Sequence, residues 1–98
     1  KLASIAREAQ EPPPQIAYPP SGSVLSLGTG TADRTLFLRA SGGTGPLRWL
    51  VNGELLPAGG YLAPVTWTVR GAGFARIVVI DASGRTAVSE IQIKLDRS

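Results

Sequence analysis

The chain has 98 residues, the size of one small domain, and it contains neither cysteine nor histidine. This composition excludes disulfides, Cys-His pairs, Ser-His-Asp triads and the usual zinc sites within the chain. The formal net charge is +3, but the arginines are spread singly along the sequence. Such spacing favours ordinary solvated strand faces over a nucleic-acid patch, which normally clusters its basic residues.

Residues 1–14 are predicted to be a linker. Residues 1–10 carry a weak apolar stripe at helical spacing, so part of the linker could be helical. Pro12, Pro13 and Pro14 then end any helix and favour a stiff polyproline II spacer. We therefore place the domain boundary at Pro14 and the folded domain at 15–98. No stretch is apolar enough to cross a bilayer and Lys1 begins the sequence, so we expect a fragment whose targeting segment lies upstream.

Three short strands are predicted in the first half of the domain. Residues 15–20 form an extended segment whose prolines favour a sheet edge. Residues 23–27 form a second strand, and the two resemble the split first strand of many sandwiches. Residues 34–40 alternate cleanly, and we assign the face that carries Leu36 and Leu38 to the core.

The segment PLRWLVNGELLP, residues 46–57, predicts a β-hairpin. Asn52-Gly53 is the dipeptide that best tolerates the positive φ angles of a type I′ turn. Alternation places Trp49 on the core face, with Arg48 and Leu50 on the opposite face.

The remaining strands follow at short intervals. Residues 61–69 place Val65, Trp67 and Val69 on one strand face, with Pro64 at a bulge or at the start of the strand. Residues 74–80 end in an apolar run that predicts a central strand buried on both faces. Asp81 and Gly84 belong to a hairpin turn before the last strand, residues 86–95. The count of about seven strands predicts an all-β fold, an immunoglobulin-like antiparallel β-sandwich.

The chain offers little for catalysis or cofactor binding. Its carboxylates are dispersed, and Asp81 lies in a turn, where a side chain that caps its own backbone is the expected role. The glycine-rich loop 42–45 leads into a strand instead of a helix, so it lacks the helix N-terminus of a phosphate cradle. We predict no enzyme activity, no metal and no cofactor.

Aromatic side chains are the remaining candidates for binding. Trp49 and Trp67 share strand faces with aliphatic residues, so we favour the core for both over a stacking surface. Tyr61, beside two glycines, is the aromatic that we most expect at the surface. Arg48, Leu50 and Tyr61 are therefore the predicted surface contacts.

Two hairpin motifs also carry a family resemblance. W-x-x-N-G at residues 49–53 precedes D-x-x-G-R at 81–85, with Trp67 between them and the entry segment IAYPPSG at 16–22. Together these motifs resemble the penicillin-binding protein C-terminus family, the C-terminal domain of bifunctional penicillin-binding protein 1C.

The resemblance implies a periplasmic accessory domain of an inner-membrane-anchored peptidoglycan glycosyltransferase and transpeptidase, with no catalytic residue in this chain. Its matched residues would be structural: Trp49, Asn52, Gly53, Trp67, Asp81 and Gly84. We expect a non-catalytic module that positions the enzyme or docks a cell-envelope protein, the partners being such a protein or the parent's catalytic domains. The alternative is a peptidoglycan-binding module that uses exposed aromatics and arginines. We expect no nucleic acid and no membrane contact by this segment.

Overall fold

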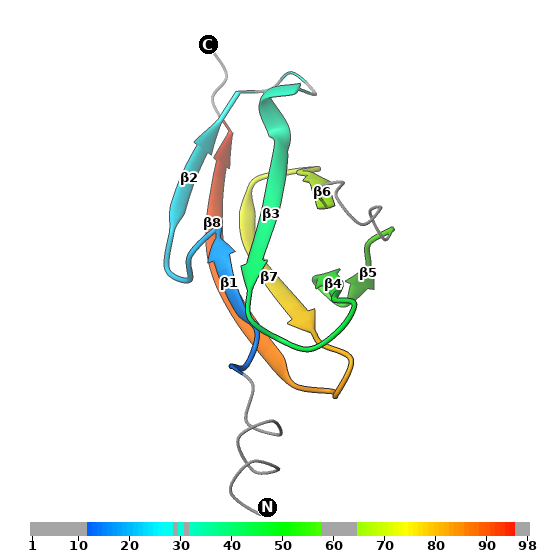
Figure 1. Cartoon of the computed structure of the whole chain (residues 1–98). Helices are drawn as coiled ribbons and strands as arrows, with labels where there is room; N and C mark the ends of the chain where they lie inside the picture. Colours follow the sequence, from blue (N-terminus) through cyan, green and yellow to red (C-terminus); the bar gives the residue numbers. More distant parts are fainter. Residues whose placement is uncertain (1–11, 29, 31, 58–64, 96–98) are drawn as a thin grey trace, which may run out of the picture.

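The computed structural model describes residues 12–28, 30, 32–57 and 65–95. These residues form eight strands and one short 3-10 helix, arranged as two facing sheets (Figure 1). The elements are β1 (Gln15–Tyr18), β2 (Val24–Leu27), η1 (Ala32–Arg34), β3 (Thr35–Ser41), β4 (Arg48–Val51), β5 (Glu54–Leu55), β6 (Val65–Thr68), β7 (Gly73–Ile80) and β8 (Thr86–Leu95). The predicted all-β sandwich is confirmed.

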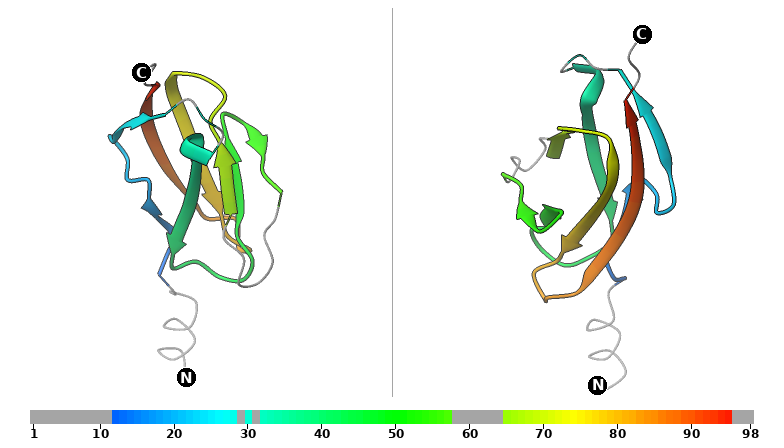
Figure 2. Two further views of the ribbon diagram at one scale, coloured as in Figure 1. Left: turned by 90° about the horizontal axis from the view of Figure 1, so that it is seen from above. Right: turned by 180° about the vertical axis from the view of Figure 1, so that it is seen from behind.

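One sheet has the order β1-β3-β6 and the other has the order β2-β8-β7-β4-β5. Figure 2 shows the two layers from above and from behind. β1 and β2 lie at edges of different sheets, so the first strand is split as the sequence predicted. The sandwich is antiparallel except for one pair, β2 and β8, which run parallel.

The core lies between the two sheets. β3 contributes Leu36 and Leu38, as its alternation predicted, and β4 contributes Trp49 and Val51. In the larger sheet with β4, β7 contributes Ala75, Ile77 and Val79, and β8 contributes Ile91 and Ile93. Val69 completes the buried cluster. The period of two along each strand sends these side chains inward and their neighbours outward.

The prediction that residues 74–80 are buried on both faces is wrong. β7 is central within its sheet, between β8 and β4, but the sandwich has only two layers and covers one face of it. Ile77 and Val79 are fully buried, whereas Val78 and Ile80 on the outer face are half-buried and Phe74 is 82% exposed.

Candidate functional site

The turn at Asn52-Gly53 binds the hairpin to the central strand of its sheet. Asn52 and Gly53 both have positive φ, 52° and 85°, as a type I′ turn requires. The Asn52 backbone N–H donates to the Arg76 carbonyl, and the Arg76 N–H donates to Asn52 Oδ1, both at 2.9 Å. The side-chain amide thereby extends the pairing of β4 with β7 by one residue.

The two tryptophans lie at different depths. Trp49, on β4, is 5% exposed and belongs to the buried cluster. Trp67, on β6, pairs with Leu36 across the smaller sheet and packs against the cluster while remaining half-buried. Both side chains therefore point toward the core, and neither forms a stacking platform on an outer face.

Asp81 is the most densely hydrogen-bonded side chain of the described residues. Its Oδ1 accepts from the Ser83 N–H (3.1 Å), the Ser83 hydroxyl (2.9 Å) and the Arg85 N–H (2.8 Å). Its Oδ2 accepts from the Thr44 N–H (3.1 Å) and Arg85 Nε (3.1 Å), and lies 3.0 Å from Arg85 Nη2. The turn that contains Gly84 (φ 91°) is thus fastened to the loop before β4.

These bonds fix the charge of Asp81. Burial alone would raise its pKa, but the donors from the Arg85 backbone, the Ser83 hydroxyl, the Thr44 backbone and the Arg85 side chain outweigh burial and lower the pKa from 3.8 to about 2. The carboxylate therefore stays ionised near neutral pH and has its lone pairs occupied. Such a group stabilises a fold and is poorly suited to exchanging protons with a substrate.

The proline segment, residues 12–14, packs against the loop before β4 that Asp81 binds through Thr44. The Gly43 N–H donates to the Pro12 carbonyl at 2.9 Å, and Pro14 is buried. Gly43 has φ 83°, and a Cβ there would lie 3.2 Å from both Pro14 Cβ and Leu47 Cδ2. Only glycine fits this close approach without strain. The described part of the predicted linker is thus packed on the domain; the boundary at Pro14 itself stays a prediction.

The predicted surface contacts lie apart. Arg48 and Leu50 project from the outer face of the larger sheet, where Leu50 lies in a row with Val78, Leu55 and Val88. Leu50 is half-buried and Arg48 is exposed. Tyr61 lies outside the described residues.

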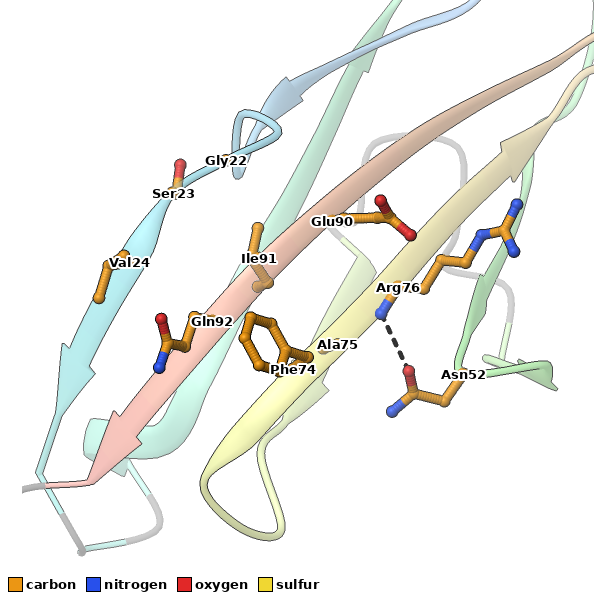
Figure 3. Close-up of a pocket in the computed structure, with 10 residues that line it drawn as sticks. All are labelled: Gly22, Ser23, Val24, Asn52, Phe74, Ala75, Arg76, Glu90, Ile91 and Gln92. Atoms are coloured by element: carbon orange, nitrogen blue, oxygen red, sulfur yellow. Dashed lines mark hydrogen bonds between the residues drawn. The ribbon is translucent and has the colours of Figure 1, made fainter.

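Sequence reasoning missed the most exposed aromatic of the described residues, Phe74. It lies beside a surface groove of about 400 Å³ lined by residues of β2, β7 and β8, by Asn52 and by the turn before β2 (Figure 3). The sequence did offer a signal for it. Phe74 and Arg76 are two residues apart on one strand, so they share a face of the sheet. Because a charged side chain such as Arg76 is expected in solvent, Phe74 is expected on the outer face as well.

Within the described part of the chain, no group of three or more acidic side chains is placed to hold a metal ion. That part also contains no helix with the length and apolarity needed to cross a membrane.

Two facing sheets with a split first strand define a small sandwich module of the fibronectin III or immunoglobulin type. Among solved structures, the fibronectin(III)-like modules of Clostridium thermocellum CbhA are similar, with a TM-score of 0.60 and 18% identity over 86% of this chain and 99% of that chain. This likeness shows the fold alone. The chain belongs to the penicillin-binding protein C-terminus family, whose model matches residues 3–93.

Family membership confirms the resemblance drawn from the two hairpin motifs and implies a cell-envelope context. Among curated proteins, no significant match is found.

Proposed function

We propose that this chain is a non-catalytic module that holds a peptidoglycan-building penicillin-binding protein in a fixed orientation. The partners would be the catalytic domains of that protein, in the periplasm. The observation that carries the proposal is the attachment of Pro12–Pro14 to the sandwich, since a module that positions its neighbours must not swivel on its connection.

Three contacts support a rigid attachment. Pro12 accepts the Gly43 hydrogen bond, Pro14 is buried, and the loop that receives both is tied through Thr44 to Asp81. A proline run is already stiff because each ring restricts φ. Docked at both ends, it would transmit the orientation of the sandwich to the chain that precedes it.

The inventory of side chains supports a non-catalytic role. The chain lacks histidine and cysteine, and its one strongly perturbed carboxylate among the described residues, Asp81, is occupied by structural hydrogen bonds. Covalent attachment of a fluorescent penicillin to this chain would contradict that role.

The rigidity can be measured with pairs of spin labels, because a chain without cysteine accepts labels only where cysteines are introduced. One label would replace Glu11, directly before the prolines, and the other would replace the exposed Thr66 on β6. We expect a narrow distance distribution that broadens severalfold when Pro12, Pro13 and Pro14 are replaced by glycine.

A second pair of labels at Thr66 and Thr86, both on strands, serves as the control. Its distribution should be the same with the prolines and with the glycines, which would show that the sandwich itself is intact. If the distances between the labels at Glu11 and Thr66 are equally broad with the prolines and with the glycines, the proposal is overturned.

A further inference from the structure

The groove around Phe74 lies on the outer face of the larger sheet, away from the proline attachment. Strand register places Val24, Gln92 and Phe74 in one row across β2, β8 and β7. Val24 is 55% exposed and Phe74 is 82% exposed. Figure 3 shows the Phe74 ring reaching from β7 toward β8, beside Gln92. An apolar side chain, an amide and an open aromatic ring therefore stand side by side.

Polar groups form the next outward-facing row along β7 and β8. Arg76 and Glu90 face each other in the register of β7 and β8, and Asn52 lies next to Arg76. In Figure 3 the Arg76 guanidinium points away from Glu90, and among the described residues no ion pair joins the two. Asn52 uses its Oδ1 on the Arg76 backbone, which leaves its NH₂ group turned outward.

The charges of the groove cancel, since its lining has one cation, Arg76, and one acid, Glu90. A nucleic acid or another polyanion would meet no excess of positive charge here. A purely apolar segment would leave the guanidinium, the carboxylate and two amides without partners on binding, which costs free energy. The lining instead offers donors and acceptors around an aromatic face, the combination that a neutral polyhydroxylated ligand satisfies.

We propose that this groove binds a glycan of N-acetylated pyranose sugars. The C–H face of a pyranose ring would stack on Phe74, since aromatic rings offer a large flat apolar surface. The acetamido group would pair its N–H and C=O with the Gln92 amide and pack its methyl group against Val24. Arg76, Glu90 and the Asn52 NH₂ would bond the hydroxyls of the neighbouring sugar. The proposal is independent of the positioning role.

Titration of the isotope-labelled 98-residue chain with soluble oligosaccharides tests the site by NMR. We expect chitotetraose to shift the amide signals of Phe74, Gln92 and Val24, and cellotetraose, which lacks acetamido groups, to bind at least tenfold more weakly. A peptide-free tetrasaccharide from peptidoglycan is the third ligand. Whichever N-acetylated ligand binds more tightly identifies the natural source.

Phe74→Ala should weaken chitotetraose binding at least tenfold, whereas Phe37→Ala should leave it unchanged. Phe37 is the matched control because it is 53% exposed on the other sheet. Both side chains lie mostly in solvent, so both variants should keep the spectrum of the folded chain. Absence of shifts, equal binding of cellotetraose, or binding that survives Phe74→Ala would each overturn the proposal.

Discussion

At Asp81 a single side chain joins two loops. Its carboxylate closes the turn before β8 through Ser83 and Arg85, and holds the loop before β4 through Thr44. Arg85 Nη2 also donates to Thr44 Oγ1 at 3.2 Å, so the cation links the same two loops as the anion. The proline segment rests on one of these loops, and its attachment therefore depends on the charge of Asp81.

The lowered pKa of Asp81 predicts a loss of stability in acid. A carboxylate whose pKa falls from 3.8 unfolded to about 2 folded stabilises the fold fully above pH 4, and this contribution is lost as the pH falls from 4 through 2. The melting temperature should drop over that interval. Asp81→Asn should melt lower at pH 7 and show a smaller drop between pH 4 and 2.

Glu90→Gln is the matched control, because it removes an exposed carboxylate from the same half of the chain. Its melting curve should follow the wild type at each pH. A drop in Asp81→Asn that parallels the wild-type drop would show that other groups cause it. If the variant does not fold, the carboxyl ¹³C shift of Asp81 in the wild type should still titrate with a midpoint near 2.

At the scale of the strand, local alternation decides which face turns inward. The sequence therefore predicted the inward Leu36, Leu38 and Trp49 correctly, because each depends only on its neighbours two residues away. The Asn52-Gly53 turn is equally local. The interpretation of β7 failed because four consecutive apolar residues, 77–80, concealed the alternation that Arg76 reveals.

Strand partners and grooves are not local properties. The parallel pairing of β2 with β8 depends on where the chain crosses from one sheet to the other, which residues 23–27 do not encode. The groove at Phe74 combines four segments, and the pairing of β2 with β8 is what brings Val24 into it. Sequence alternation could place Phe74 outside, but it could not bring Val24 and Gln92 beside it.

The different depths of the two tryptophans predict different costs of truncation. Trp49→Ala should lower the free energy of unfolding by about 3–5 kcal/mol, because the cavity opens inside the buried cluster. Trp67→Ala should cost less, about 1–2 kcal/mol, because its half-buried side chain loses less apolar contact. Urea unfolding followed by far-UV circular dichroism measures both. Equal losses would contradict the depth that we assign to Trp49.

For the whole molecule, the crossing between β1 and β2 adds a bonded link between the two sheets to the core that they share. β1 pairs with β3 in one sheet and β2 with β8 in the other. Between them, the buried Ser89 hydroxyl on β8 donates to the Pro19 carbonyl at 2.6 Å. The Gly22 N–H donates to the Glu90 carbonyl at 2.7 Å. The crossing is thus bonded to β8 along its length, and the sheets should unfold as one unit.

Removal of the buried bond at the crossing tests this coupling. Ser89→Ala leaves the Pro19 carbonyl without its donor in a buried position, so we expect a loss of about 1–3 kcal/mol. Ser23→Ala is the matched control, because its hydroxyl donates to the Pro20 carbonyl in an exposed position, where water can replace it at a cost below about 0.5 kcal/mol. Native-state hydrogen exchange should show the loss in β3 and in β8 by the same factor, since a single cooperative unit opens as a whole. Faster exchange in β8 alone would mean that the two sheets open independently and that the crossing does not couple them.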